Sequence, residues 1–255
     1  MTSRQDSSGQ QEMPLIEHLL ELRNRLLKMV LAVVICFAAI YPFANELYLW
    51  VSDPLTSLLP VGQTMIATDV TSPFFAPLKL ALVLAVFVAI PVILYQIWSF
   101  IAPGLYAHEK RLAFPLLFTS VILFYLGAAF AYYVVFPLVF GFFTAIGPEG
   151  IVELPDISSY LNFVLKMFFA FGVAFEIPIA TILLILTGAT TPADLAAKRP
   201  YIVVGCFVIG MLLTPPDIIS QTLLAVPMWL LFEIGILFGR LAKRARAEAE
   251  EAPEP

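Results

Sequence analysis

Charged residues and the side chains that most enzymes use for catalysis are scarce in this sequence. Only 13% of its 255 residues are charged, whereas 60% are hydrophobic. A soluble domain of this length needs more polar surface, so the composition indicates a protein whose solvent is the lipid bilayer. The sequence contains no HExxH motif, no phosphate-binding loop and no cluster of cysteine and histidine with metal-ligand spacing. These absences argue against a metalloprotease, a P-loop nucleotide site and a metal site.

Histidine and cysteine occur only twice each. His18 and His108 lie outside the apolar segments, so no membrane-embedded serine has a histidine base beside it, as an intramembrane serine protease requires. Cys36 and Cys206 lie within apolar segments, where we interpret them as small core side chains. The opening MTSRQDSSGQQEMP is polar, and we expect no cleaved signal peptide there. We therefore expect a protein that is not an enzyme and that uses neither a cofactor nor a metal.

Long apolar segments make up most of the chain. Six of them are predicted to be membrane-spanning helices: 27–49, 75–100, 112–136, 160–186, 201–213 and 218–238. If these helices alternate in direction, twelve of the fourteen lysines and arginines lie on one side, and only Lys79 and Lys166 do not. The positive-inside rule makes that side cytoplasmic. The expected fold is therefore an all-α integral membrane protein with six transmembrane helices and both termini in the cytoplasm.

The fifth apolar segment is too short to cross the bilayer alone. Residues 201–213 reach only about 20 Å at 1.5 Å per residue, whereas the hydrocarbon core is about 30 Å thick. The segment ends at TPPD, where two prolines force a turn. We therefore expect the last two helices to form a short hairpin whose tip lies below the outer surface.

The segments between and beyond the helices have different expected roles. Residues 50–73 contain three prolines and are too long for a plain turn, so we expect them to cap one end of the bundle. The predicted division of the chain is a disordered cytoplasmic tail over 1–13, a six-helix membrane domain over 14–239, and a second cytoplasmic tail over 240–255. We expect this last tail to be disordered as well, because it passes from a basic helix end to an acidic stretch that contains proline.

Glu176 is the only charged residue in FFAFGVAFEIPIATILLILTG, residues 168–188. A carboxylate at that depth costs about 2.5–3.5 kcal/mol to insert, so it indicates a function. Pro178 cannot donate a backbone hydrogen bond and frees a carbonyl in the preceding turn. Together they indicate a place where water or another polar chain enters the bilayer. An alternative is a proton-coupled small-solute transporter that uses Glu176 as its proton site, but the internal repeats of many such transporters are missing.

Two predicted cytoplasmic segments carry the other informative acids. PLIEHLLELRNRLL has leucines at helical spacing and indicates an amphipathic surface helix that carries Glu21. Arg25 follows Glu21 by four residues, so a plain surface ion pair is the alternative there. In SFIAPGLYAHEKRL, Glu109 stands beside two basic residues, and an ordinary positively charged flank is the alternative. Two carboxylates on one face are suited to bidentate capture of arginines from a partner.

Four motifs together resemble the TatC family, the polytopic receptor subunit of the twin-arginine translocase. They are HLLELRNRL at 18–26, SFIAPGLYAHEKR at 99–111, AFGVAFEIP at 170–178 and GMLLTPPDIISQ at 210–221. The resemblance extends from about residue 14 to residue 239. It implies a multi-pass protein of the bacterial cytoplasmic (inner) membrane. Its implied function is to recognise twin-arginine signal peptides and move folded proteins across the membrane with the proton-motive force.

The resemblance also implies partners and site residues. Implied partners are twin-arginine signal peptides, single-span subunits of the TatA and TatB types, the lipid bilayer and further copies of the chain, but no nucleic acid. The implied signal-peptide site consists of Glu21, Arg23, Phe100 and Glu109. The implied intramembrane polar site consists of Glu176 and Gln221. The implied docking site for a partner helix consists of Met211, Thr214 and Gln221. Positions important for transport are implied at Pro54 and Asp217, while catalytic residues and metal ligands are not expected.

Overall fold

The computed structural model describes residues 8–57, 65–101, 110–146, 155–213 and 218–251. Within these residues the regular structure is helical, apart from one isolated bridge between Ile66 and Asp156. The first helices are α1 (Ser8–Ile40), α2 (Ala44–Thr56), α3 (Ser72–Ile101) and α4 (Lys110–Phe130). A π-helical turn (Ala131–Val135) joins α4 to α5 (Phe136–Ile146). The remaining helices are α6 (Ile157–Ala174), α7 (Ile177–Leu186), α8 (Pro192–Ala197), α9 (Arg199–Leu213) and α10 (Ile218–Glu251).

The structure confirms an all-helical fold with membrane-spanning character over the described residues. Five stretches are long and apolar enough to cross a bilayer: Leu19–Thr56, Ser72–Phe100, Phe114–Phe143, Ile157–Leu186 and Gln221–Arg244. The helix Arg199–Leu213 is apolar but shorter, as the sequence predicts. Six crossings with both termini in the cytoplasm stay a prediction, because length and composition define only five full spans.

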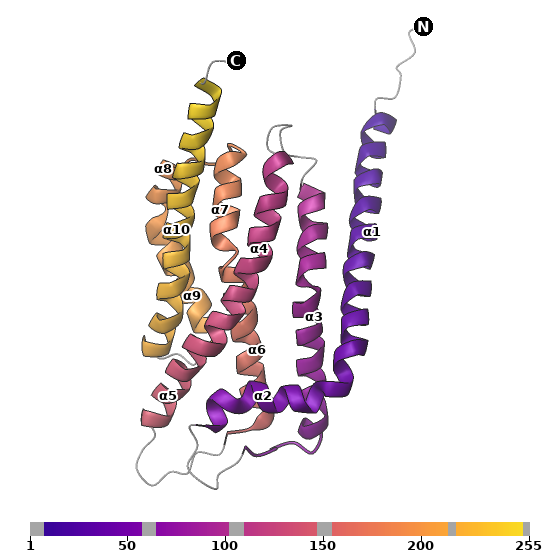
Figure 1. Cartoon of the computed structure of the whole chain (residues 1–255), viewed down its shortest axis with the longest axis vertical. Helices are drawn as coiled ribbons and strands as arrows, with labels where there is room; N and C mark the ends of the chain where they lie inside the picture. Colours follow the sequence, from indigo (N-terminus) through magenta and orange to yellow (C-terminus); the bar gives the residue numbers. More distant parts are fainter. Residues whose placement is uncertain (1–7, 58–64, 102–109, 147–154, 214–217, 252–255) are drawn as a thin grey trace.

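The first apolar segment bends earlier than expected. Instead of continuing to residue 49, α1 ends at Ile40, and a 3-10 turn over Tyr41–Phe43 follows, with Pro42 in its first positions. Because proline has no amide hydrogen, it favours a break in the helix there. The chain then enters α2, which lies across one end of the bundle (Figure 1). The expected cap is therefore present but begins at Ala44 rather than at residue 50.

The last helix is longer than expected. It continues to Glu251, into the segment 240–255 for which the sequence predicts disorder. Alternating alanine and glutamate in that segment are strong helix formers, which explains the extension. At the other end, α1 begins at Ser8, inside the predicted tail over 1–13. The division of the chain into two tails and a central domain stays a prediction.

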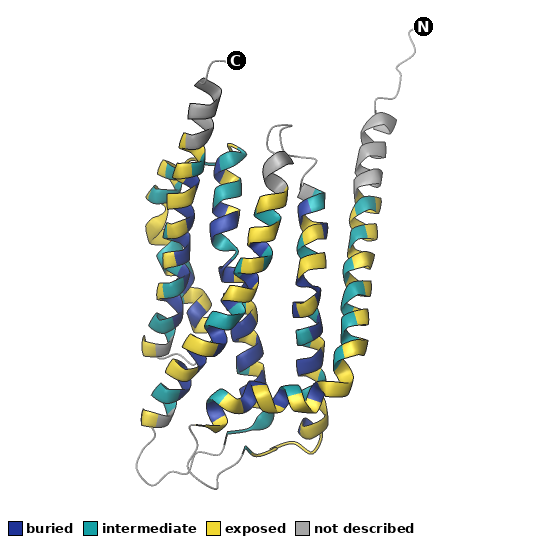
Figure 2. Cartoon of the chain, viewed as in Figure 1, coloured by how far each residue is buried: buried dark blue, intermediate teal, exposed yellow. Residues whose placement is uncertain are grey.

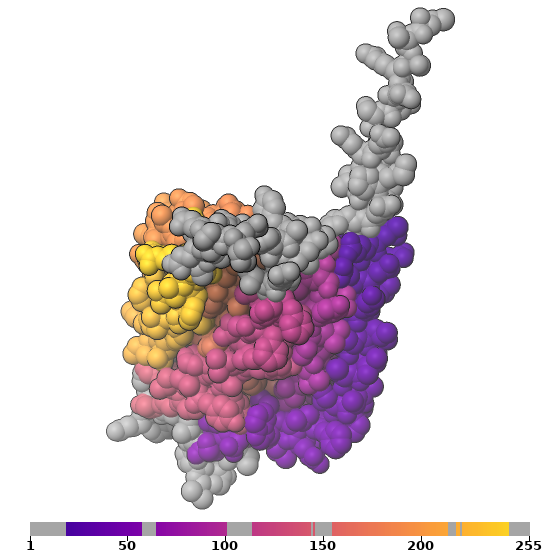
Figure 3. Space-filling model, turned by 45° about the horizontal axis from the view of Figure 1, so that its top comes forward, coloured from indigo at the N-terminus to yellow at the C-terminus, as the bar shows by residue number. Residues whose placement is uncertain are grey.

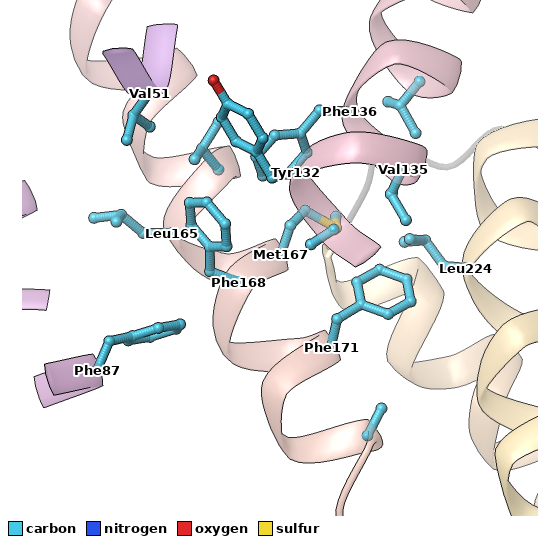
Figure 4. Packing of buried hydrophobic residues seen from close by; sticks show 14 of the residues in the cluster. Val51, Phe87, Tyr132, Val135, Phe136, Leu165, Met167, Phe168, Phe171 and Leu224 are labelled. Atoms are coloured by element: carbon cyan, nitrogen blue, oxygen red, sulfur yellow. The ribbon is translucent and has the colours of Figure 1, made fainter. Parts of the chain in front are cut away.

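The core lies around α6, whose buried side chains pack against the π-helical turn, α5 and α10. Phe168 packs edge-to-face on Phe136 with ring centroids 5.2 Å apart, and Phe171 lies between these rings and Leu224 of α10 (Figure 4). Helices α4 and α6 approach closely because Gly172 leaves room for Phe124. A Cβ atom added to Gly172 would lie 2.7 Å from the Phe124 ring. Close backbone approach at small residues is typical of packing in membranes.

Helix α1 forms one edge of the molecule and packs mainly along α3 (Figures 1 and 3). Its outward surface carries exposed apolar side chains, including Leu31, Val34 and Ile35 (Figure 2). In water this would be an unfavourable surface, but in a bilayer it is the surface that contacts lipid. The edge position of α1 leaves one end of α3 within reach of its polar side chains.

Candidate functional site

Glu21 and Phe100 lie at the same end of the bundle, where α1 packs along α3. The guanidinium of Arg25 joins the two helices, because its Nε donates to Glu21 Oε1 at 3.0 Å and its Nη2 donates to the Ser99 carbonyl at 3.0 Å. Nη2 also donates to Glu21. The Glu21 side chain remains 40% exposed, whereas that of Arg25 is only 19% exposed. The ion pair that the sequence offers as the plain alternative is therefore present, and it is part of a helix-to-helix contact.

The other members of the implied signal-peptide site are placed differently. Phe100 follows Ser99 directly and is half-buried. Arg23 is exposed and donates to its neighbour Asn24 at 3.3 Å rather than joining Glu21. This is expected, since residues two apart on a helix do not face each other. Glu109 lies outside the described residues.

Glu176 stands at the break between α6 and α7. Its amide donates to the Val173 carbonyl at 3.0 Å, three residues back, so the regular ladder is interrupted just before Pro178. The hydroxyl of Ser120, on α4, donates to Glu176 Oε2. Glu176 Oε1 is enclosed and has no hydrogen-bond partner among the described residues. The carboxyl group therefore has one satisfied acceptor and one buried acceptor without a donor among the described residues.

Ser120 is a functional candidate that sequence reasoning missed. It is buried, and it lies 56 residues from its partner, so no local pattern connects the two. The only signal is a polar Thr119–Ser120 pair inside the apolar segment of α4. Buried hydroxyls in membrane helices usually find a partner, so such a pair indicates a nearby acceptor.

Gln221 lies at a different place from Glu176. Its amide donates to the Phe207 carbonyl at 2.8 Å, which joins α10 to α9. By contrast, Pro178, next to the Glu176 break, packs against Gly235 of α10. Fourteen residues of helix separate Gln221 from Gly235, about 21 Å along the axis. The structure therefore does not bring Glu176 and Gln221 together into one polar site.

The implied docking site on α9 is only partly described. Met211 is half exposed, and Val204, Val208 and Leu212 are also exposed on this helix. Together they give α9 an outward apolar surface. Thr214 and Asp217 lie outside the described residues.

Pro54 lies within α2 and explains an interaction that the sequence does not reveal. Since proline lacks an amide hydrogen, the carbonyl four residues earlier, on Trp50, loses its helical donor. The hydroxyl of Tyr132, from the π-helical turn, donates to that carbonyl at 2.9 Å. The hydroxyl of Tyr160 donates to the neighbouring Val51 carbonyl at 2.8 Å. Pro54 is thus part of the contact that holds α2 across the end of the bundle.

Asp156 joins the segment before α3 to the start of α6. One carboxylate oxygen accepts from the Ser159 amide at 2.8 Å and caps α6. The other accepts from the amide and the hydroxyl of Thr68, at 3.1 and 2.8 Å. These hydrogen bonds, that from Ser159 first, hold the pKa of the Asp156 carboxyl well below its usual range. Two backbone hydrogen bonds support the same junction. The Ile66 amide donates to the Pro155 carbonyl at 3.0 Å, and the Ile157 amide donates to the Ile66 carbonyl at 2.9 Å.

These features define a polytopic helical membrane protein whose polar side chains bind and position other groups. In the described part of the chain, no cluster of histidine, cysteine and acidic residues could hold a metal ion. Three acids are instead paired: Glu21 with an arginine at one end of the bundle, Glu176 with a serine within it, and Asp156 with a backbone amide at the other end. A transport or receptor subunit is the class of protein that this arrangement fits.

Comparison with known proteins agrees with this class. The family model described as Sec-independent protein translocase protein (TatC) matches residues 17–227. The chain is 59% identical over 254 residues to the TatC protein of Azotobacter chroococcum mcd 1, a match that covers 99% of each chain. It is 59% identical over 227 residues to TatC of Escherichia coli (strain K12), covering 89% of this chain and 88% of that protein.

A solved structure shows the same fold. The crystal structure of the twin-arginine translocase receptor TatC superposes with a TM-score of 0.79 at 41% identity, and the match covers 89% of this chain and 99% of the solved one. The chain belongs to the TatC family. It is therefore a translocase subunit, a transport protein rather than an enzyme, and a multi-pass protein of the bacterial inner membrane.

Proposed function

We propose that this chain is the receptor that captures twin-arginine signal peptides of folded cargo at the end of the bundle where α1 meets α3. The observation that carries the proposal is the exposed Glu21 carboxylate, held by an arginine beside Phe100. Arg25 shows that the carboxylate already accepts a guanidinium in this place. An incoming arginine can share Glu21 while Arg25 keeps its bond to the Ser99 carbonyl.

The proposed site includes three further residues, of which Phe100 and Arg23 are described by the structure and Glu109 lies outside the described residues. Glu109 supplies the second carboxylate, so that each acid receives one arginine of the pair. Phe100 supplies an apolar surface for the peptide residues that follow the arginines. Arg23 adds a positive charge at the edge of the site. The peptide's apolar part then inserts along the bundle, and the proton-motive force drives the transport of the cargo.

Six crossings with both termini in the cytoplasm are part of this proposal. The Glu21 site lies at the end that carries most of the basic residues, which the positive-inside rule places in the cytoplasm. The short α9 and the adjoining end of α10 then form the fifth and sixth crossings where the bilayer is thinned. Twin-arginine cargo is made in the cytoplasm, so the site faces the side from which its ligand arrives.

Single-span subunits of the TatA and TatB types are proposed to dock on the α9–α10 hairpin. Exposed Met211 and its apolar neighbours on α9 offer a surface for a partner helix. Gln221 stabilises that surface by joining the two helices, and Thr214 and Asp217 are proposed to complete the hairpin tip. Further copies of the chain complete the receptor complex. Membership of the TatC family favours this translocase over a small-solute transporter that uses Glu176.

Binding of a fluorescent twin-arginine peptide to the full chain in nanodiscs tests the receptor site. Each charge-assisted hydrogen bond contributes about 1.5–3 kcal/mol, so Glu21→Ala and Glu109→Ala should each weaken binding about 10-fold or more. A twin-lysine peptide should bind more weakly than the twin-arginine one, because lysine cannot bind a carboxylate bidentately. The matched control is Glu46→Ala, an exposed acid on α2 at the other end of the bundle. Unchanged affinity in the double variant Glu21→Ala/Glu109→Ala would refute the site.

A further inference from the structure

The only two basic residues outside the predicted cytoplasmic clusters line the same groove. Lys79 lies on α3 and Lys166 on α6, and both contribute to a groove of about 760 Å³ that also involves α9 and α10. The ammonium group of Lys79 donates to Asn162 Oδ1 at 2.9 Å. Asn162 and Lys166 are four residues apart on α6 and therefore share one face of that helix. Two cations and an amide from two helices thus meet at one side of the groove.

The rest of the groove is apolar. Val83, Phe169, Val173, Ile177, Ile209 and Leu213 are among its lining residues. No acidic residue lines it, and neither lysine forms an ion pair within the described part of the chain. The groove therefore combines an uncompensated positive charge with an extended hydrocarbon surface. An amphiphile with an anionic head and an apolar tail is complementary to both.

The two lysines lie just inside the boundary of the hydrocarbon core, within reach of the lipid headgroups. A helix of 30 residues, such as α3, is about 45 Å long, so about 7 Å extends beyond each side of a 30 Å hydrocarbon core. Lys79 follows Ser72, the first residue of α3, by seven residues, and it therefore lies about 3 Å inside the core boundary. The stretch Ile157–Leu186 also has 30 residues, and Lys166 follows its first residue by nine, so Lys166 lies about 6 Å inside the boundary of the hydrocarbon core. A lysine side chain can extend from either depth to a lipid phosphate.

The size of the groove distinguishes a lipid from a peptide helix. A transmembrane helix about 10 Å across and 30 Å long occupies roughly 2,400 Å³. This is about three times the volume of the groove, whereas an acyl chain is much thinner than a helix. Helices α3, α6, α7 and α10, which contribute to the groove, belong to stretches that are long and apolar enough to cross a bilayer, where phospholipid is always present at high concentration.

We propose that this groove is a binding site for an anionic phospholipid of the leaflet opposite the Glu21 site. Its phosphate lies between Lys79 and Lys166, and Asn162 holds the Lys79 ammonium group toward it. One acyl chain follows the apolar lining toward Val173 and Ile177. These two residues flank the break at Glu176, so the bound chain covers the α6–α7 junction on the groove side. The proposal does not depend on which peptide the receptor binds.

Native mass spectrometry of the full chain, extracted from membranes that contain phosphatidylglycerol and phosphatidylethanolamine, tests the site. The variant Lys79→Gln/Lys166→Gln removes both cations but keeps side chains of similar length. A lysine near the membrane surface adds about fivefold to the binding of an anionic lipid, so the double variant should retain about 25-fold less phosphatidylglycerol. The matched control Lys198→Gln/Lys243→Gln changes two exposed lysines at the other end of the bundle and should retain the wild-type amount.

Equal retention of phosphatidylglycerol in the two double variants would overturn the proposal. Displacement of the lipid by soluble glycerol phosphate would also overturn it, since the site would then recognise a free anion without the acyl chain. A photoreactive side chain in place of Ala170, which lines the groove, identifies the occupant directly in native membranes. An adduct with the mass of an anionic phospholipid supports the proposal. An adduct with a peptide or with a second protein contradicts it.

Discussion

The hydroxyl of Tyr132 donates a 2.9 Å hydrogen bond to the backbone carbonyl of Trp50, the carbonyl that Pro54 leaves without a helical donor. The same arrangement recurs in α3. Pro91 leaves the Phe87 carbonyl without its donor, and the hydroxyl of Tyr125 donates to it at 2.9 Å. In lipid an unpaired carbonyl is costly, and at both Pro54 and Pro91 a tyrosine hydroxyl from a neighbouring segment replaces the missing donor.

The contact between Tyr132 and Trp50 predicts a coupling that thermal or chemical unfolding in detergent can measure. Tyr132→Phe leaves the Trp50 carbonyl unsatisfied and should lower the free energy of unfolding by about 1–3 kcal/mol. In a Pro54→Ala background the amide of Ala at position 54 can donate to the Trp50 carbonyl. Tyr132→Phe should then lower the free energy of unfolding by about 1 kcal/mol less than it does in the wild-type background.

Tyr133→Phe is the matched control for this cycle, because Tyr133 is the neighbouring tyrosine and is exposed. It should have little effect in either background. Equal costs of Tyr132→Phe with and without Pro54 would show that the proline and the hydroxyl act independently.

A second prediction concerns the close approach of α4 and α6. In Gly172→Ala the new methyl group would lie 2.7 Å from the Phe124 ring, so the change should destabilise the protein by about 1–3 kcal/mol. Phe124→Leu should relieve the overlap, and the double variant should regain part of the loss. Gly205→Ala on α9, where nothing lies within 4 Å, should be neutral or stabilising in the same unfolding measurement. Additive effects of the Gly172 and Phe124 changes would contradict this packing.

The local features of this fold could be predicted from the sequence, whereas its long-range contacts could not. All six apolar segments are helices, α9 is short, and the helix breaks at Glu176, because hydrophobic runs and prolines act within a few residues. The bend at Pro42 was missed because its surroundings are as apolar as the helix before it.

The partners that complete the candidate sites are distant in the chain. Arg25 reaches the Ser99 carbonyl across 74 residues, and Tyr132 reaches Trp50 across 82. Hydroxyl and guanidinium groups have many acceptors to choose from, and only the packing of the helices decides which one lies in reach. A sequence can therefore indicate that Glu176 needs a donor but cannot identify that donor as Ser120.

The junction at Asp156 predicts a pH dependence of stability. Its hydrogen bonds from Ser159 and Thr68 lower the pKa of the carboxyl below that of the unfolded chain. The stabilisation is therefore fully present above the usual carboxyl range and is lost as the pH falls below about 4 toward the folded-state pKa. When the thermal unfolding of wild type and Asp156→Asn is followed from pH 7 to pH 3, the difference in stability between them should stay constant down to about pH 4 and begin to narrow below it.

The control for Asp156 is Glu46→Gln, an exposed acid on α2. The difference in stability between Glu46→Gln and wild type should change less over this pH range than the difference for Asp156→Asn. The structure records no side-chain hydrogen bond to Glu46, a described residue, whereas Asp156 accepts hydrogen bonds from Thr68. A stability difference between wild type and Asp156→Asn that stays constant down to pH 3 would show that the carboxylate does not stabilise the junction.

The pair formed by Ser120 and Glu176 predicts how transport depends on the intramembrane acid. The acceptor that Ser120 uses is an oxygen, and glutamine provides one at the same position, so Glu176→Gln should keep the hydrogen bond and most of the transport of a twin-arginine cargo. Glu176→Leu removes both acceptors, leaves the buried Ser120 hydroxyl without this partner, and should impair transport. Ser120→Ala should have an intermediate effect, because one acceptor loses its donor while the acid remains. The measurement is cargo export in cells at matched expression of each variant.

If Glu176 relays protons instead of holding a polar partner, the Gln variant must lose as much transport as the Leu variant, since an amide releases no proton. Equal and complete loss in both would therefore replace the binding role of Glu176 with a proton-transfer role.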